Sequence, residues 1–311
     1  MKPLIIIVGP TAVGKSALGV ELALALDGEI ISGDSVAVYR KLNIGSAKPT
    51  KAEQKGVRHH LLDILDPTES FTAYDFQTQT QKLISSIRNQ GKIPIIVGGT
   101  GLYIRSILDG FHFPEEGSEE IKTKWLEFAK EYGKQELHAQ LEKVDPQSAT
   151  RLHPNDTARI IRALEVYEIT GKPLSQQRFY KEREYRDLDK SIIYLGLTAP
   201  RNIIYEKIDR RCALMVKYGL IDEVLSLLKE GYSPKLKSLS SIGYRHVIQY
   251  LRGLTTFEEM LRLFKRDTRR FAKRQLTWFR RDPRIKWYDT SAQDLNQIVI
   301  EISNLVSKLA P

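Results

Sequence analysis

The sequence predicts an α/β fold in which helices cover both faces of a parallel sheet and a helical insertion interrupts the core. Short, continuous apolar runs such as Leu4–Val8 and Ile93–Val97 are typical of strands buried on both faces. They alternate with amphipathic stretches, as strand–helix–strand units require. Residues 113–187 are charged and helical in pattern, with no strand-like run. We therefore expect a core of residues 1–112 and 188–311, and an inserted helical domain of residues 113–187.

The core elements follow one another in a regular order. Before the insertion we expect a strand at Leu4–Val8, a helix at Ser16–Leu26, a strand at Glu29–Ser32, a helix at Phe71–Gln90 and a strand at Ile93–Val97. The insertion begins after a linker at Pro114–Gly117, and one of its helices ends at Thr170 before Gly171. Strand character returns at Ser191–Leu197 and Ile285–Tyr288. Ligands of such folds bind at the carboxyl ends of the strands.

The chain carries excess positive charge and a single cysteine. The 48 Lys and Arg residues exceed the 38 Asp and Glu residues, for a formal net charge of +10, which points to an acidic partner such as nucleic acid. Cys212 alone excludes an intramolecular disulfide and a cysteine metal site. No apolar run approaches the ~18 residues of a membrane span. We expect a cytoplasmic protein without a membrane partner and, since no obligate interface is indicated, a monomer.

The strongest chemical signal is a phosphate-loop motif directly after the first strand. It reads Gly9-Pro10-Thr11-Ala12-Val13-Gly14-Lys15-Ser16 and has a predicted strand before it and a predicted helix after it. The glycines let backbone N–H groups approach phosphate oxygens, and the helix N-terminus adds partial positive charge. Lys15 would neutralise a phosphoryl group, and the Ser16 hydroxyl would bind Mg²⁺. The motif predicts a polyphosphate ligand without specifying ATP.

Two further strand ends fall on the same edge of the predicted sheet. Asp34 follows the second strand, where three roles are open: Mg²⁺ ligand, general base, or helix N-cap. The third strand ends in Gly98-Gly99-Thr100, where many phosphate-loop hydrolases have a metal-binding Asp. Its absence argues against a motor-type ATPase. The glycines either admit a ligand or form a tight turn, and Thr100 offers a hydroxyl.

Positive charge concentrates between Lys265 and Arg284. Nine Lys and Arg residues stand against two Asp residues in this stretch, which is typical of a nucleic-acid footprint, although a solvated face is the alternative. Phe264, Phe271 and Trp278 recur every seven residues, so we expect them to share one helical face as core anchors.

Three smaller features can be explained by structural roles, although an RNA-binding role is also open for the first. Arg159 and Arg162 lie one turn apart on a helix of the insertion, where they either reach RNA phosphates or pair with glutamates of the same helix. His59-His60 lacks further ligands at metal-binding spacing, so we expect a structural role. Arg210-Arg211 is expected to head a helix that ends near Gly219.

Eight segments, in order along nearly the whole chain, resemble the tRNA dimethylallyltransferases, the bacterial tRNA isopentenyltransferase family. They are GPTAVGKS (9–16), SGDSVAVYR (32–40), LNIGSAKPT (42–50), HHLLDI (59–64), GGTGLY (98–103), RIIRALEVYEITGKPLS (159–175), SIGYR (241–245) and AKRQLTWFR (272–280). The phosphate loop alone is widespread, but the ordered set is specific. The resemblance implies a P-loop NTPase-like core.

The resemblance also implies a reaction. A dimethylallyl group passes from dimethylallyl diphosphate to N6 of the adenosine 3′-adjacent to the anticodon, and diphosphate is released. Asp34 is then the general base, and Thr100 orients the adenine and the diphosphate. The phosphate loop, residues 9–16, holds the diphosphate with Mg²⁺ at Ser16, and Arg211 closes on it. The implied partners are dimethylallyl diphosphate and the anticodon stem-loop of tRNA.

A larger set is implied to contact tRNA. Several family members carry Gln or another longer residue where Ala37 stands, so here that position offers only backbone or shape. The implied tRNA-binding residues are Asp34, Ser35, Val36, Ala37, Thr100, Lys122, Ala158, Arg159, Ile160, Ile161, Arg162, Ser240, Ser241, Ile242, Gly243, Tyr244, Arg245, Lys273, Arg274, Gln275, Leu276, Thr277, Trp278, Phe279 and Arg280.

Two other functions stay open from the residues alone. The same core serves kinases that transfer phosphate from ATP to a nucleoside or nucleotide, and the basic stretch would then be incidental. A non-catalytic RNA-binding protein with a nucleotide switch is the third hypothesis. Incubation with labelled ATP and, separately, with labelled dimethylallyl diphosphate and tRNA distinguishes them.

Overall fold

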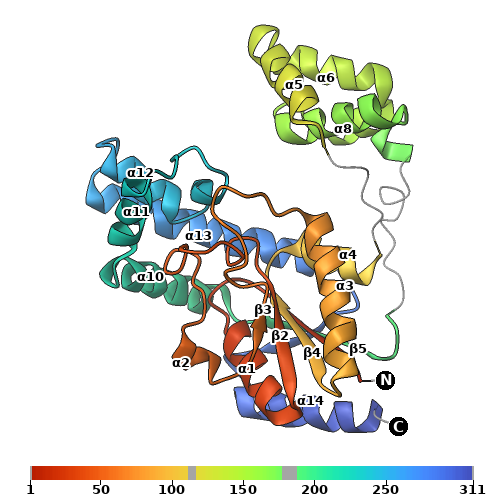
Figure 1. The fold of residues 1–311 in the computed structure, drawn as a ribbon, viewed down its shortest axis with the longest axis vertical. Helices are drawn as coiled ribbons and strands as arrows, with labels where there is room; N and C mark the ends of the chain where they lie inside the picture. Colours follow the sequence, from red (N-terminus) through yellow and green to blue (C-terminus); the bar gives the residue numbers. More distant parts are fainter. Residues whose placement is uncertain (1, 111–116, 177–187, 310–311) are drawn as a thin grey trace. The chain divides into compact units, whose positions relative to one another are not determined.

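The computed structural model describes residues 2–110, 117–176 and 188–309, and its contacts divide the chain into two compact units (Figure 1). We call Met1–Leu108 with Asp187–Pro311 the sheet unit, and Asp109–Arg186 the helical unit. The predicted boundaries at 112/113 and 187/188, and most of the predicted linker Pro114–Gly117, lie outside the described residues or at their limits.

Among the described residues, six strands form the sheet unit's single sheet, and every neighbouring pair is parallel. The strands are β1 (Leu4–Val8), β2 (Gly28–Gly33), β3 (His59–His60), β4 (Ile93–Gly98), β5 (Ile192–Thr198) and β6 (Lys286–Asp289). Their order is β3-β2-β4-β1-β5-β6, so β1 is central, between β4 and β5. The predicted parallel α/β core is confirmed.

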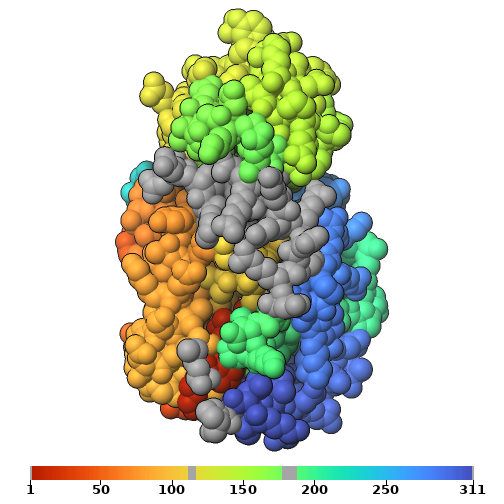
Figure 2. All heavy atoms as spheres, turned by 90° about the vertical axis from the view of Figure 1, so that its right-hand side faces the viewer, coloured from red at the N-terminus to blue at the C-terminus, as the bar shows by residue number. Residues whose placement is uncertain are grey.

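Alternating side chains of the strands bury the two faces of the sheet under different helices. Ile5 and Ile7 belong to a core shared with α1 and α14, whereas Leu4 and Ile6 belong to a core shared with α3, α4, α10 and α13. In Figure 2 the orange side chains of α3 lie on one flank of this unit and the blue side chains of the C-terminal helices lie on the other. The helices of the sheet unit are α1 (Lys15–Leu26), α2 (Lys51–Gln54), α3 (Ala73–Asn89), α4 (Gly101–Leu108), α10 (Arg201–Lys217), α11 (Leu220–Lys229), η2 (Ser238–Ser240), α12 (Tyr244–Leu251), α13 (Phe257–Phe279) and α14 (Leu295–Leu309).

Local signals explain where the main helices begin and end. The α3 helix starts after Thr72, whose hydroxyl accepts the Asp75 N–H while the Asp75 carboxylate accepts the Thr72 N–H. One prediction is wrong: Arg210 and Arg211 lie inside α10, not at its head. The helix extends further toward the N-terminus because Ile204 and Ile208 bury a continuous apolar stripe.

The paired histidines have a structural role at the outer edge of the sheet, where β3 is the last strand. They form β3, which pairs with Ile30 and Ile31 of β2. His60 also bonds Glu29, which is 2% exposed, and Lys92 donates to the same carboxylate at 2.8 Å. Burial would raise the pKa of Glu29, but the bonds from Lys92 and His60 outweigh it and hold that pKa below its ordinary value.

The helical unit has its own apolar core. Among its described residues it contains α5 (Glu119–Glu131), α6 (Gly133–Val144), α7 (Pro146–Arg151), α8 (Thr157–Thr170) and η1 (Leu174–Gln176). Leu137 and Leu141 of α6 pack with Ile160 and Leu164 of α8. The α8 helix ends as predicted at Gly171, which takes the left-handed φ of 66°.

None of the helices in the described ranges is both long and apolar enough to cross a membrane.

A glycine pair joins β2 and β4 where both strands end. A Cβ at Gly98 would lie 2.4 Å from the carbonyl oxygen of Gly33 and 2.6 Å from its Cα. We expect Gly98→Ala to lower the free energy of unfolding by about 3 kcal/mol, because only backbone movement can relieve the clash. Gly91→Ala is the control, since a Cβ there meets nothing within 4 Å and costs about 1–2 kcal/mol for its φ of +77°. If urea unfolding showed the same decrease in the free energy of unfolding for both variants, this expectation would be wrong.

Candidate active site

Three chain segments meet at the carboxyl edge of the sheet. The phosphate loop follows β1, Asp34 follows β2, and Thr100 follows β4. Because β4 lies between β1 and β2, segments far apart in the sequence become neighbours. The Thr100 N–H also donates to the Gly33 carbonyl at 3.3 Å, which ties the β4–α4 turn to the end of β2. The sheet therefore gathers the predicted phosphate site and both predicted catalytic residues on one edge.

The phosphate loop has a backbone that side chains would disturb. Gly9 has a φ of 140°, Ala12 of 67° and Gly14 of 103°. A Cβ at Gly9 would lie 2.4 Å from the carbonyl oxygen of Leu197 on β5. The motif's glycines thus serve the turn itself as well as the approach of a ligand.

Lys15, the first residue of α1, folds back across the loop. Its Nζ donates to the Pro10 carbonyl at 2.7 Å. Burial, helped by the positive charge of Arg211, lowers the pKa of Lys15 to about 7, and the Asp34 carboxylate opposes that shift. An anion bound in the loop would favour the protonated amine. The site is therefore poised to bind negative charge.

Arg211 reaches the same loop from α10. Its Nη1 donates to the Thr11 hydroxyl at 3.2 Å, and its Nη2 makes a longer contact of 3.5 Å with the Ala47 carbonyl. Burial lowers the pKa of the guanidinium, and Asp34 opposes the shift, but arginine stays protonated at physiological pH. The structure thus brings a second cation to the phosphate loop.

Asp34 uses one carboxylate oxygen to hold a turn. Oδ1 accepts the N–H groups of Val36 at 2.8 Å and Ala37 at 3.2 Å. The residues that follow form a turn and not a helix. Asp34 therefore caps a turn, whereas a helix cap was one of its three predicted roles. Oδ2 is engaged by no hydrogen bond from another described residue. One oxygen fixes the side chain, and the other can face a ligand.

Glu223 of α11, which no sequence pattern indicated, anchors the segment beside Arg211. Its carboxylate accepts the backbone N–H groups of residues 43–45 at 2.8–3.2 Å and the Tyr244 hydroxyl at 2.6 Å. A Cβ at Gly45 would lie 2.4 Å from the Tyr244 ring. The partners are up to 180 positions apart, so no local pattern could reveal the contact.

The basic helix α13 carries an open groove of about 550 Å³. Trp278 in this groove is 41% exposed, whereas Phe264 is 2% exposed, so the prediction that both are core anchors is wrong for Trp278. The indole of Trp278 lies against Gly101, where a Cβ would be 2.2 Å from its Nε1. Because glycine has no side chain, it covers little of the indole ring. The groove is lined by Arg270, Lys273, Arg274, Thr277, Trp278 and Arg281.

The other predicted tRNA-binding residues range from buried to exposed side chains. Arg162 pairs with Glu165 at 2.6 Å, one of the alternatives left open, and Arg245 pairs with Asp267 at 2.7 Å. In each pair the arginine is partly exposed, whereas the carboxylate is largely buried, with side-chain exposures of 6% for Glu165 and 14% for Asp267. Ile160, Ile161, Tyr244, Gln275 and Phe279 are buried, whereas Lys122, Ala158, Arg159, Ser240, Lys273, Arg274, Thr277, Trp278 and Arg280 are exposed.

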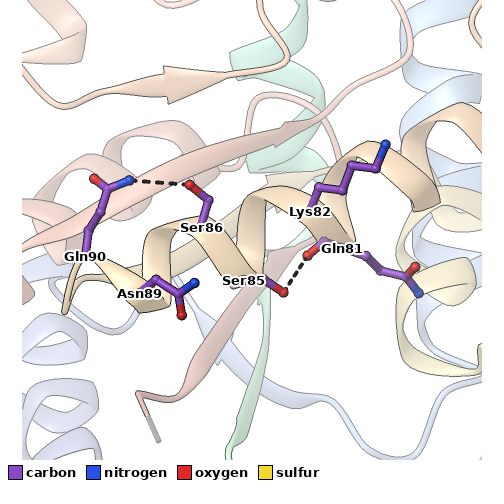
Figure 3. A pocket seen from close by; sticks show the side chains of 6 residues that line it. All are labelled: Gln81, Lys82, Ser85, Ser86, Asn89 and Gln90. Carbon is purple, nitrogen blue, oxygen red and sulfur yellow. Dashed lines mark hydrogen bonds between the residues drawn. The ribbon is translucent and has the colours of Figure 1, made fainter.

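A second groove, of about 690 Å³, lies on α3. It runs along the second half of α3, the half that leads to the amino edge of the sheet (Figure 3). Its polar side chains partly satisfy one another, as where Gln90 donates to the Ser86 hydroxyl at 3.4 Å. It is lined by Gln81, Lys82, Ser85, Ser86, Asn89 and Gln90. None of the predicted site residues lines it.

Comparison with known proteins then decides the family. The family model described as IPP transferase matches residues 37–282, which include Ala37, Thr100, Arg211 and all of α13. The chain belongs to the IPP transferase family.

Individual relatives agree with this assignment. The chain is 64% identical over 299 residues to a tRNA dimethylallyltransferase of Desulfitobacterium hafniense, covering 96% of this chain and 95% of the relative. It is 50% identical over 301 residues to one of Carboxydothermus hydrogenoformans, covering 96% of each. The kinase alternative gains no support from these relatives.

Solved structures extend the similarity to the fold. A full-length tRNA isopentenylpyrophosphate transferase from Bacillus halodurans is 41% identical with a TM-score of 0.72, covering 99% of this chain and 96% of that one. A eukaryotic dimethylallyltransferase acting on tRNA is 29% identical with a TM-score of 0.80, covering 100% of this chain and 81% of that one. The P-loop-like α/β fold expected for the family is therefore confirmed.

For an IPP transferase with this Lys15, pyrophosphate binding should depend on pH. The pKa of about 7 means that Lys15 loses its proton above neutrality in the free protein, so binding must then take up a proton. We expect the ratio of the pyrophosphate Kd of wild type to that of Lys15→Arg to rise above pH 7, by up to about tenfold per pH unit. The arginine stays charged, and the ligand's own ionisation affects both proteins equally. A ratio from calorimetry that stays constant with pH would contradict the prediction.

Proposed function

We infer that this chain transfers a dimethylallyl group from dimethylallyl diphosphate to N6 of the adenosine 3′-adjacent to the anticodon of tRNA, and releases diphosphate. One observation carries the inference: the phosphate loop, with two cations on it, lies on the same sheet edge as a carboxylate that has one oxygen unengaged. Its relatives named tRNA dimethylallyltransferase support the same reaction.

The chemistry matches these groups. The adenine amine is a weak nucleophile because its lone pair is delocalised into the ring, whereas an allylic diphosphate is a strong electrophile because positive charge spreads over the allyl carbons. The C–N bond forms as the C–O bond to diphosphate breaks, and the amine proton passes to the unengaged oxygen of Asp34. Thr100, beside Gly33, orients the adenine and the diphosphate. Alignment and charge neutralisation supply the rest.

The leaving group is stabilised by the phosphate loop. Lys15 and Arg211 neutralise the departing diphosphate, and the backbone of residues 9–14 surrounds it. The family uses a divalent metal, and we propose Mg²⁺ held by the Ser16 hydroxyl. That donor suits a hard cation, and Ser16 is exposed on the first turn of α1. Among the described residues no cluster of three or more His, Cys, Asp or Glu could hold a metal, so diphosphate oxygens and water would complete the shell. Bound Mg²⁺ supplies further neutralisation of the diphosphate charge.

We also propose contacts to the anticodon stem-loop of tRNA. The target base must leave the anticodon stack to reach Asp34. The protein therefore has to bind the anticodon stem-loop on both sides of that base. We propose that segment 35–37 and those side chains of segments 240–245 and 273–280 that are not buried do so in the sheet unit. In the helical unit we propose Lys122 and the side chains of segment 158–162 that are not buried. We propose a monomer acting in the cytoplasm.

The test is analysis of nucleosides by mass spectrometry. Unmodified tRNA is incubated with the protein and dimethylallyl diphosphate, then digested. Dimethylallyl-adenosine should appear, at the position 3′ of the anticodon, only when both protein and diphosphate are present. Labelled phosphate passing from ATP to a nucleoside, with no alkylated adenosine, would instead establish the kinase. Release of more than one diphosphate per protein molecule would exclude a non-catalytic RNA-binding protein.

A further inference from the structure

Gln275 stands apart from its neighbours on α13 because its side chain points inward. It is 6% exposed on a helix whose adjacent Lys273 and Arg274 face solvent. Its Oε1 accepts the Thr11 N–H at 2.8 Å, and its Nε2 donates to the Gly99 carbonyl at 3.0 Å. These partners are 264 and 176 positions away in sequence. One amide therefore bridges the phosphate loop and the β4–α4 turn.

The bridge is closely fitted. A Cβ at Gly99 would lie 2.2 Å from the Gln275 Nε2 and 3.6 Å from the Gly9 carbonyl oxygen, so the amide fills the space between the two segments. Thr11 is also the residue whose hydroxyl accepts from Arg211. Gly99 directly precedes Thr100. The amide thus contacts Thr11, which Arg211 also contacts, and the residue directly before Thr100.

We propose that Gln275 is a positioning residue, which sets the spacing between the diphosphate loop and the Gly99–Thr100 turn and ties both to the basic helix α13. The proposal rests on the function proposed above and gives this buried side chain a role other than direct contact with tRNA. Only an amide supplies one acceptor and one donor here: glutamate keeps the acceptor and loses the donor, and methionine loses both. An unpaired Thr11 N–H or Gly99 carbonyl would shift to find a new partner.

Kinetics and binding of Gln275→Met and Gln275→Glu test the proposal. We expect both to lower kcat/KM for dimethylallyl diphosphate by about 10- to 100-fold and to weaken binding of inorganic pyrophosphate, with the tRNA Kd within about twofold of wild type. Gln249→Met is the matched control, because Gln249 is exposed on α12. Gln275→Glu keeps the shape of the side chain, so it remains informative if Gln275→Met fails to fold.

The outcomes separate three roles. A weaker tRNA Kd with unchanged pyrophosphate binding would overturn the proposal in favour of direct tRNA contact. A lower melting temperature with unchanged pyrophosphate binding and kinetics of the folded protein would overturn it in favour of a purely structural role. If wild type binds pyrophosphate and the variants do not, the positioning role stands even if no dimethylallyl transfer is detected, because in that case only the proposed reaction has failed.

Discussion

Asp34→Asn should lower the rate of dimethylallyl transfer by about 10²–10⁴-fold, the range seen when a general base is removed. Asparagine has the shape of aspartate, and its oxygen can still accept from Val36 and Ala37, so the turn after β2 stays in place. What it loses is the basicity of the second oxygen. Single-turnover rates at saturating dimethylallyl diphosphate measure the effect, and the tRNA Kd should be largely unchanged.

The control for this substitution lies at the other end of the same strand. Asp27 is exposed just before β2, at the amino edge of the sheet, with a left-handed φ of 48° that asparagine also adopts readily. Asp27→Asn should keep the wild-type rate. Near-normal turnover in Asp34→Asn would remove Asp34 from the role of base.

The affinity for tRNA should fall steeply with salt, by about 10³-fold between 50 and 200 mM if at least six phosphates are contacted. The groove on α13 supplies exposed cations for these contacts. Replacing Lys273, Arg274 and Arg281 together with alanine should reduce the slope of log K against log salt by about 2. Filter binding across a salt series measures both slopes.

Two cations away from the groove provide the comparison. Lys82 is exposed on α3, and Lys308 is exposed on α14, which packs on the opposite face of the sheet from α13. The double variant Lys82→Ala/Lys308→Ala should keep the wild-type slope. Two results would contradict a tRNA-binding surface on α13. One is a tRNA affinity of wild type that does not change with salt, and the other is an equal reduction of the slope of log K against log salt in both variants.

Local patterns predicted the parts of the fold that local physics determines. Leu4–Val8 has the predicted bounds because a run of β-branched residues must be buried on both faces. The strand β3 was missed because two histidines carry no such pattern and become a strand only by pairing with β2. Trp278 follows the heptad spacing, but a seven-residue repeat does not show where the core under a helix ends.

The candidate site divides in the same way. The phosphate loop and Asp34 could be found because each follows a strand directly, and parallel strands bring their ends together. Glu223 and Gln275 could not be assigned their contacts, because each bonds a backbone segment remote in sequence and resembles any other polar helix residue. A long-range hydrogen bond made by one side chain produces no periodic pattern in the sequence.

The central place of β1 has a consequence for synthesis of the protein. One of its two partners, β5, follows the helical unit in the chain, and Glu223 and Gln275 come later still. A ribosome delivers the N-terminus first, so the phosphate motif emerges long before the residues that brace it. A nascent chain stalled before α11 would carry that motif and Asp34 without the side chains of Glu223 and Gln275 that hold the surrounding segments. Until β5 emerges, one edge of β1 is open to pairing with other unfinished chains.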